Sequence, residues 1–288
     1  MDDELAARIE AITGVGVTSS RPLGGGCVAD VRQISMADGS RMVAKVDTGT
    51  RPTLDLEARM LRYLNEYSAL PVPAVIHDDP DMLLLEYIEG GGRITSDVEH
   101  HAASLLAALH AIAPPGRHDF GLDFDTLIGP LPQPNPWTSS WVAFFRDARL
   151  LPMADRALQS GHLPTSTRHA VDQIATRLDA LLAEPPHPSL IHGDIWSGNV
   201  IADGERVCAF IDPSVAYAHP EIELAFITLF STFGATFFDA YHERRPIETD
   251  FFEVRRDIYN LYPLLVHTTL FGGSYAQSVA SITRRFAG

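Results

Sequence analysis

Positive charge is scarce in this chain. Its 288 residues include 37 aspartates and glutamates against 22 lysines and arginines, which gives a formal net charge of −15. A surface this acidic repels nucleic acid and anionic lipid head groups, so we expect the protein to bind neither nucleic acid nor membranes. Lys45 is the only lysine, and the other 21 basic residues are arginine.

The single lysine also limits which lysine-dependent sites the chain can contain. A phosphate-binding loop of the Gly-Lys-Ser/Thr type is absent, because Lys45 stands between Ala44 and Val46. Arginine does not replace lysine where a compact ammonium group is needed. Any Schiff base would therefore have to form on Lys45.

Cysteine and long apolar runs are also rare. Cys27 and Cys208 are the only cysteines, too few for a four-cysteine zinc site or a disulfide framework, which favours a reducing compartment. No apolar run reaches the ~18 residues of a membrane span. The acidic start at residues 1–4 lacks the features of a signal peptide. We expect a soluble, cytoplasmic protein.

The order of predicted elements indicates an α+β protein with two lobes. Residues 1–88 read as a helix, several antiparallel strands, a second helix and two further strands, as apolar periodicity and turn residues predict. Glycines at 90–92 follow as a hinge. Residues 89–288 read as mainly helical, with a Pro- and Gly-rich loop at 114–136 and a hairpin around Asp203-Gly204. The predicted division is a nucleotide-binding lobe, 1–88, and a catalytic and substrate-binding lobe, 89–288.

The strongest chemical signal is the stretch 192–199, His-Gly-Asp-Ile-Trp-Ser-Gly-Asn. It places Asp194 five residues before Asn199, and Asp212 follows at the end of the next predicted hairpin. Strand pairing would bring Asn199 and Asp212 to one end of that hairpin, and oxygen ligands of this kind suit Mg²⁺. Asp194 could then accept a proton from a hydroxyl nucleophile. Alone, Asp194 and Asn199 would more simply be turn-capping residues.

A second set of residues lies near the N-terminus. Gly24, Gly25 and Gly26 would let backbone N–H groups approach phosphate oxygens. Lys45, on the third strand, is a candidate phosphate ligand, with Glu57 on the following helix as its ion-pair partner. Each signal alone is weak, because tight hairpins and solvated ion pairs are common. The order of glycine loop, strand lysine, helix glutamate and then Asp…Asn…Asp is typical of a kinase.

The strand at 82–88 gives two further candidates. As an edge strand before the hinge, it would present backbone groups of Glu86 and Ile88 to an adenine ring. A plain buried strand explains the same residues equally well.

Several stretches of the chain resemble the fructosamine kinase family, within the wider aminoglycoside phosphotransferase and protein-kinase-like group. The likeness extends over nearly the whole chain, and Trp196-Ser197-Gly198 separates this family from other phosphotransferases. The stretches that carry it are residues 24–27, 135–137, 140–141, 144–146, 192–199, 210–213, 259–262 and 270–273.

The resemblance implies an ATP-dependent kinase of two-lobed, protein-kinase-like fold that phosphorylates the 3-hydroxyl of ketosamines, a deglycation reaction. Asp194 would be the catalytic base, and Asn199 and Asp212 the Mg²⁺ ligands. Lys45 would hold the ATP phosphates, with Glu57 fixing its position.

The resemblance also implies substrate contacts and shows one departure. Trp196 would form an apolar wall under the sugar, with core packing as the alternative. His267 could also contact the sugar, although core packing is the simpler explanation for His267. The family usually has an aspartate, which braces the catalytic loop, where Glu223 stands. We therefore assign Glu223 no role in the chemistry.

Other interpretations stay open at this point. Pro213 follows Asp212, and little chain remains for an activation segment, which disfavours a protein kinase. The alternatives are a kinase for another small hydroxyl or amino-sugar substrate, and a nucleotide-binding regulator without turnover.

The two cysteines have separate interpretations. Cys27, in the glycine loop, could be a redox-sensitive or inter-subunit thiol or an inert side chain, and Cys208 is interpreted as a packing residue. The sequence leaves open monomer or homodimer, and a free or protein-linked ketosamine.

Overall fold

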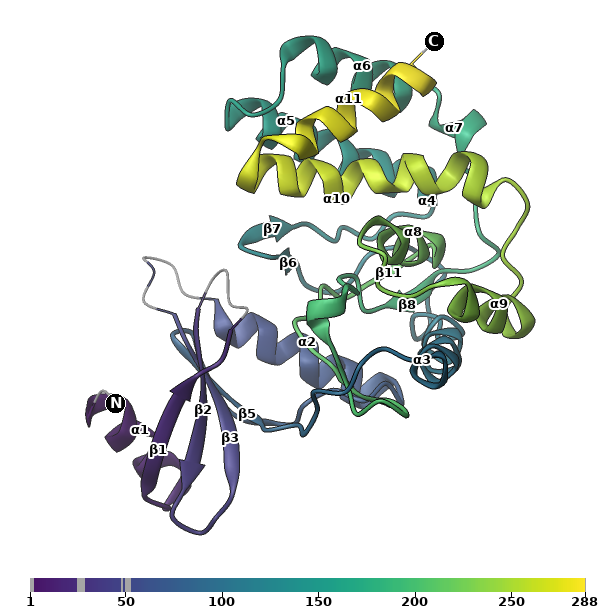
Figure 1. Cartoon of the computed structure of the whole chain (residues 1–288). Coiled ribbons are helices and arrows are strands. Elements are labelled where there is room, and N and C mark those ends of the chain that lie inside the picture. The colour runs from purple at the N-terminus through teal and green to yellow at the C-terminus, as the bar shows by residue number, and fades with distance from the viewer. Residues whose placement is uncertain (1–2, 25–28, 48, 50–52, 288) are drawn as a thin grey trace. The chain divides into compact units, whose positions relative to one another are not determined.

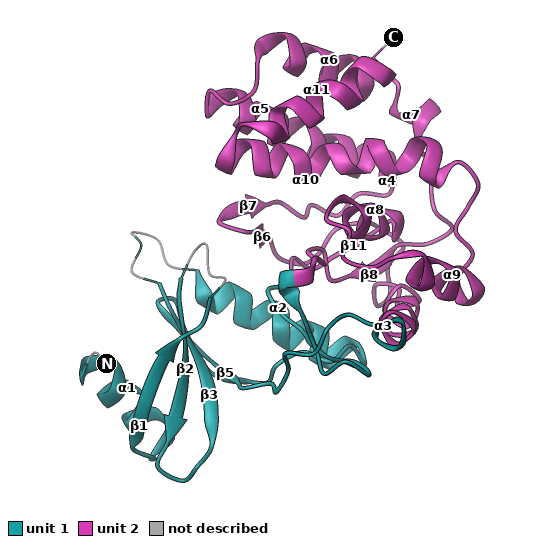
Figure 2. Cartoon of the chain, in the orientation of Figure 1, with its two compact units in different colours: residues 1–98, 198–213 teal, residues 99–197, 214–288 magenta. Residues whose placement is uncertain are grey.

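The computed structural model describes residues 3–24, 29–47, 49 and 53–287 (Figure 1). Their contacts group into two compact units, coloured separately in Figure 2. The first unit comprises residues 1–98 and 198–213, and the second comprises residues 99–197 and 214–288. The chain therefore crosses between the units three times, whereas the predicted lobes divide once, after residue 88.

The first unit contains a five-stranded antiparallel sheet of order β1-β2-β3-β5-β4. Successive side chains of a strand point to opposite faces, so β5 contributes residues to a hydrophobic cluster on each face of the sheet. Met82 and Leu84 join a cluster with Ile9 of α1, and Leu83 and Leu85 join one with α2 residues such as Leu61. The elements are α1 (Asp3–Thr13), β1 (Val17–Pro22), β2 (Asp30–Met36), β3 (Arg41–Val46), α2 (Leu54–Tyr67), β4 (Val75–Asp79) and β5 (Met82–Glu86).

The predicted hairpin around Asp203-Gly204 is present and belongs to the first unit. Its strands are β9 (Val200–Ala202) and β10 (Val207–Phe210). The Phe210 N–H donates to the Pro71 carbonyl at 2.8 Å, and the Gly92 N–H donates to the Ala202 carbonyl at 2.9 Å. A Cβ on Gly92 would lie 2.1 Å from the carbonyl carbon of Asp203, so this close approach requires glycine.

The second unit is mainly helical. The long helix α10 (Arg256–Phe271) packs on α5, α8 and α11, and Figure 1 shows α11 lying along it. The other helices are α3 (Ser96–Leu109), α4 (Trp141–Phe145), α5 (Leu151–Gln159), α6 (Thr165–Ala175), α7 (Leu178–Leu181), α8 (Glu221–Leu229), α9 (Ala235–Arg244) and α11 (Ser274–Phe286), with π-helical segments at Arg146–Leu150 and Phe251–Arg255.

Two short strand pairs in this unit depart from the sequence prediction. The stretch 114–136, predicted as a loop, contains β6 (Thr126–Ile128) paired with β7 (Leu131–Gln133). Strand β8 (Ser189–Ile191) pairs with β11 (Ala216–Ala218), and β11 lies where we predicted helix. Strands of three residues are too short to show a period of two, so these pairings could not be read from the sequence.

Among the helices of the described residues, none is both long enough and apolar enough to cross a lipid bilayer.

Candidate active site

The predicted ion pair between Lys45 and Glu57 is present in the first unit. The Lys45 ammonium Nζ lies 2.7 Å from Glu57 Oε1. The same ammonium also donates to Asp212 Oδ1. The ammonium thus joins side chains from strand β3, helix α2 and the segment that follows hairpin β9–β10. Glu57 is 12 residues and Asp212 is 167 residues from Lys45 in the sequence.

Burial makes this cluster electrostatically strong. Lys45 is only 8% exposed, and the side chains of Glu57 and Asp212 are 16% and 40% exposed. Burial by itself would lower the pKa of Lys45, but the two carboxylates outweigh it and raise that pKa above its ordinary value. Lys45 therefore stays a cation, and such buried pairs are scarcer than surface ion pairs because desolvation is costly.

Hairpin β9–β10 sets the positions of Asn199 and Asp212. Val200 pairs with Phe210, and the Ile211 N–H donates to the Asn199 carbonyl at 3.0 Å. The two predicted metal ligands therefore flank one end of the hairpin, as the sequence pattern predicted. Asn199 is buried. Asp212 has a backbone φ of 54°, a left-handed conformation that costs a non-glycine residue about 1 kcal/mol or more and is often found at functional sites.

The structure says less about the other residues predicted to bind the nucleotide. Gly24 is the last described residue before the gap at 25–28, and Gly25, Gly26 and Cys27 lie outside the described residues. The predicted roles of all four stay predictions. The edge strand predicted at 82–88 is wrong, because β5 ends at Glu86 and lies between β3 and β4. The β4–β5 hairpin covers the expected free edge, and the Glu86 N–H donates to the Ala74 carbonyl at 2.9 Å. Adenine contacts by Glu86 and Ile88 stay a prediction.

The loop that carries Asp194 belongs to the second unit and follows strand β8. Gly193 has a φ of 89°, and a Cβ built there would lie 2.0 Å from the Ser214 carbonyl oxygen, so only glycine fits. The Ser214 N–H donates to the His192 carbonyl at 2.7 Å. Asp194 is half-buried, and its N–H donates to His192 Nδ1 at 3.3 Å. These contacts fix the backbone that leads into the predicted base.

Glu223 braces this loop, although the sequence analysis assigned it no role. Its Oε1 accepts the Gly193 N–H at 2.6 Å, and its Oε2 lies 2.8 Å from His110 Nε2. His110 Nδ1 lies 2.7 Å from the Tyr241 hydroxyl. Burial raises the pKa of Tyr241, so the phenol keeps its proton and can donate it to Nδ1. His110 then donates from Nε2 to the carboxylate, so every group in this chain of contacts has a partner.

His110 and Tyr241 were missed by sequence reasoning. Both are fully buried, and a lone histidine or tyrosine on an apolar helix carries no local mark of a functional contact. The family's usual aspartate at position 223 was the one available signal, and the longer glutamate still reaches Gly193.

The two predicted substrate residues, Trp196 and His267, are brought together through a third ring. Phe230 lies between them, with its centroid 6.3 Å from Trp196 and 5.0 Å from His267. Trp196 is 39% exposed, so it is not a core residue. His267 donates from Nδ1 to the Pro263 carbonyl at 2.8 Å.

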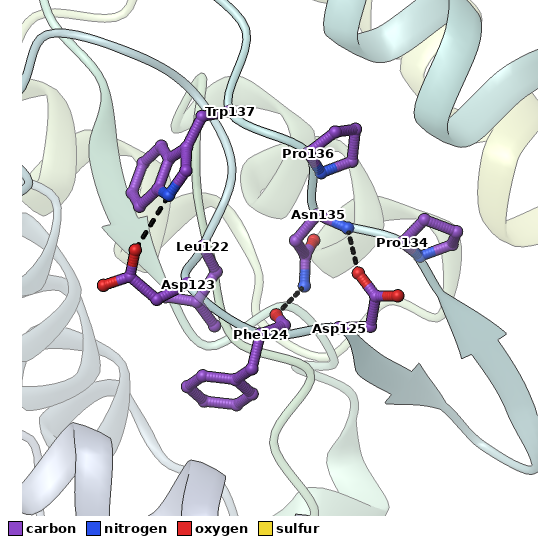
Figure 3. Close-up of a pocket in the computed structure, with 8 residues that line it drawn as sticks. All are labelled: Leu122, Asp123, Phe124, Asp125, Pro134, Asn135, Pro136 and Trp137. Atoms are coloured by element: carbon purple, nitrogen blue, oxygen red, sulfur yellow. Dashed lines mark hydrogen bonds between the residues drawn. The ribbon is translucent and has the colours of Figure 1, made fainter.

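A surface pocket of about 550 Å³ lies beside hairpin β6–β7 (Figure 3). Asn135 donates its N–H to Asp125 at 2.9 Å, and the Trp137 indole donates to Asp123 at 2.9 Å. None of the predicted site residues that the structure describes is among its lining. Its walls are formed by Leu122, Asp123, Phe124, Asp125, Pro134, Asn135, Pro136 and Trp137.

Comparisons with known proteins agree with this arrangement. The family model described as fructosamine kinase matches residues 1–287. A probable ketoamine kinase of Synechocystis is 38% identical over 209 residues, which cover 70% of this chain and 66% of that protein. The chloroplastic protein-ribulosamine 3-kinase of Arabidopsis thaliana is 30% identical over 285 residues, which cover 92% of this chain and 82% of that protein.

Solved structures show the same fold. A candidate fructosamine-3-kinase of Thermobifida fusca superposes with a TM-score of 0.87 at 30% identity, covering 99% of this chain and 98% of that one. An aminoglycoside phosphotransferase superposes with a TM-score of 0.70 at 19% identity, with 99% of both chains covered, which is a likeness of fold. The predicted family and the predicted two-lobed, kinase-like α+β fold are therefore confirmed. The chain belongs to the fructosamine kinase family and is an ATP-dependent phosphotransferase.

Proposed function

We propose that this protein transfers the γ-phosphoryl group of ATP to the 3-hydroxyl of a ketosamine, a deglycation reaction. The observation that carries the phosphotransfer chemistry is the buried contact of Lys45 with both Glu57 and Asp212. The acceptor follows from the family and from relatives named ketoamine kinase and protein-ribulosamine 3-kinase. A third support is Asp194, in a loop anchored at His192 and Gly193.

The nucleotide would be held by residues of the first unit. Lys45 is a compact, permanently charged ammonium and offsets the negative charge of the ATP phosphates. Glu57 fixes the lysine side chain, so little conformational freedom is lost when the phosphates bind. Gly24, Gly25 and Gly26 would bring backbone N–H groups to the phosphates, and the backbone at Glu86 and Ile88 would contact the adenine ring.

Asn199 and Asp212 would hold Mg²⁺. Their donors are oxygens on one end of hairpin β9–β10, and Mg²⁺ is usually bound by one or two protein oxygens with waters and phosphates completing its shell. Among the described residues there is no cluster of three or more histidine, cysteine or carboxylate ligands, which also fits an ion shared with a nucleotide. When bound, Mg²⁺ neutralises developing phosphate charge.

Asp194 would act on the acceptor. Its carboxylate accepts the proton of the attacking hydroxyl as the new O–P bond forms and the bond from the γ-phosphorus to the bridging oxygen breaks, leaving ADP. Glu223 acts through the backbone, because it holds the Gly193 N–H next to Asp194. Trp196 would form an apolar wall against the sugar. His267 carries its hydrogen on Nδ1, so its Nε2 is the atom that can accept a hydrogen bond from a sugar hydroxyl.

The test is ADP release with Mg-ATP and a panel of ribulosyl-, erythrulosyl- and fructosyl-lysine, with the phosphorylated carbon assigned by NMR. Asp194→Asn should lower kcat by about 10²- to 10⁴-fold, as expected for loss of a general base. Asp239→Asn, a matched change of an exposed aspartate on α9, should leave kcat unchanged. Product carrying phosphate at another position, or no turnover of any ketosamine by a protein that binds ATP, would contradict the proposal.

A further inference from the structure

The rings of Trp196, Phe230, His267, Phe271 and Tyr275 form a continuous row on the second unit, here called the aromatic strip. His267 is at its centre, with ring centroids 5.0 Å from Phe230, 5.8 Å from Phe271 and 4.9 Å from Tyr275. Phe271 and Tyr275 are 6.2 Å apart. The strip therefore begins two residues after Asp194 and extends by successive ring contacts across α10 onto α11.

Local backbone geometry accounts for the far end of the strip. Helix α10 ends at Phe271, and Gly272 and Gly273 both have a φ of 62°. The chain reverses direction at these two glycines. Glycine is needed there because it adopts positive φ angles without strain. Helix α11 then begins at Ser274, and Tyr275 returns to pack against His267.

The strip is accessible at both ends. Trp196 is 39% exposed and Phe271 is 56% exposed, while Phe230, His267 and Tyr275 are half-buried. Phe226, a buried residue of α8, packs against Phe230, with the two ring centroids 5.3 Å apart. Single exposed rings are common, but a contiguous row beside a catalytic loop marks a binding surface.

The side chains of the strip are aromatic and uncharged. None of its five residues carries a carboxylate, ammonium or guanidinium group. Burial lowers the pKa of His267 and outweighs the hydrogen bond from Nδ1 to the Pro263 carbonyl, which by itself would raise it, so the neutral ring is favoured. A ligand group that lies on these rings should therefore be hydrocarbon. A carboxylate would lose hydration there and gain no cation.

We infer that the aromatic strip binds the hydrocarbon arm attached to the ketosamine nitrogen and makes this arm a determinant of specificity. The inference rests on the proposed function. Trp196 and His267 would serve the sugar, and the rings of Phe271 and Tyr275 continue beyond them, which gives a place for several methylene groups. Phe271 and Tyr275 contact the arm and take no part in the phosphotransfer.

The test compares ribulosyl-methylamine, ribulosyl-butylamine and ribulosyl-glycine as substrates. In the wild type, the butyl compound should have a KM about 10-fold lower than the methyl compound, as expected for three methylenes that contact rings on one side. Phe271→Ala should reduce this ratio to about 3, and Phe271→Asp should abolish it. The KM for ATP and for the methyl compound should stay unchanged. Ribulosyl-glycine should bind no better than the methyl compound.

Phe252→Ala is the matched control, because Phe252 is 40% exposed in the same unit and contacts Phe238 and Phe251, outside the strip. Calorimetric binding of the same compounds provides a readout without turnover. A wild type with equal affinity for the methyl and butyl compounds would overturn the inference while leaving the proposed function intact. The inference would also be overturned if Phe271→Ala had half the molecular mass of the wild type in solution and an unchanged ratio of the two KM values. The strip would then join two copies of the chain. Binding of the butyl compound with no phosphorylation of any ketosamine would instead defeat the proposed function alone.

Discussion

Replacing Glu223 tests whether one buried carboxylate holds the catalytic loop in place. The side chains of Glu223 and His110 are completely buried, and the carboxylate accepts hydrogen bonds from Gly193 and His110. In Glu223→Ala both donors lose their acceptor, and each unsatisfied buried donor costs about 1–3 kcal/mol. We therefore expect the free energy of unfolding to fall by about 2–6 kcal/mol.

Glu223→Gln should be milder, because the amide can still satisfy both neighbours. Its oxygen accepts the Gly193 N–H, and its NH₂ donates to His110 Nε2 if the histidine moves its hydrogen to Nδ1 and donates to the Tyr241 oxygen. The change then removes only the charge from two hydrogen bonds, a loss of about 1–2 kcal/mol. The same series should affect catalysis, since a shift of about 1 Å in a catalytic group can cost about 10²-fold in rate.

Thermal unfolding and steady-state kinetics of the three proteins provide the assay. At about 2 °C per kcal/mol, Glu223→Ala should lower Tm by roughly 4–12 °C and Glu223→Gln by roughly 2–4 °C. Glu243→Ala, at an exposed site on α9, should change the free energy of unfolding by less than about 0.5 kcal/mol. The reasoning is refuted if Glu223→Ala is as stable as the wild type, or if Glu223→Gln is less stable than Glu223→Ala.

Three further predictions concern other parts of the protein. Gly193→Ala should abolish turnover and lower Tm, because its Cβ would overlap the Ser214 carbonyl oxygen; normal kinetics would contradict this. Lys45→Met should raise the KM for ATP and, by leaving Glu57 and the 40% exposed Asp212 without their cation, destabilise the first unit by about 3 kcal/mol, the lower end for a broken buried pair, measured by denaturant unfolding. His219 has a pKa lowered to about 3 by burial and by Arg255. Between that pKa and about 6.5 the unfolded chain binds a proton that the folded chain does not, so stability should fall as pH drops through this window. His219→Asn should make the acid limb of a plot of Tm against pH shallower, and an unchanged limb would count against the assignment.

Much of the site follows from residue type and order. Lys45 could be assigned because it is the only lysine, and the placement of Asn199 and Asp212 followed from the hairpin signal at Asp203-Gly204. Strand β3 spans Arg41–Val46, where the turn residues Asp38-Gly39 before it and the β-branched Val43 and Val46 within it favour a strand. Long-range partners could not be read in this way. The contact of Lys45 with Asp212 joins residues 167 positions apart, and no local pattern encodes it.

The sequence alone determined the family and the kinase-like order of chemical groups. Only the tertiary structure decided which of them touch. It gave Glu223 the role of holding Gly193, and it joined Trp196 to His267 through Phe230. The physical reason is that periodicity and turn chemistry act over a few residues, whereas buried hydrogen bonds and ring contacts depend on packing between helices far apart in the chain.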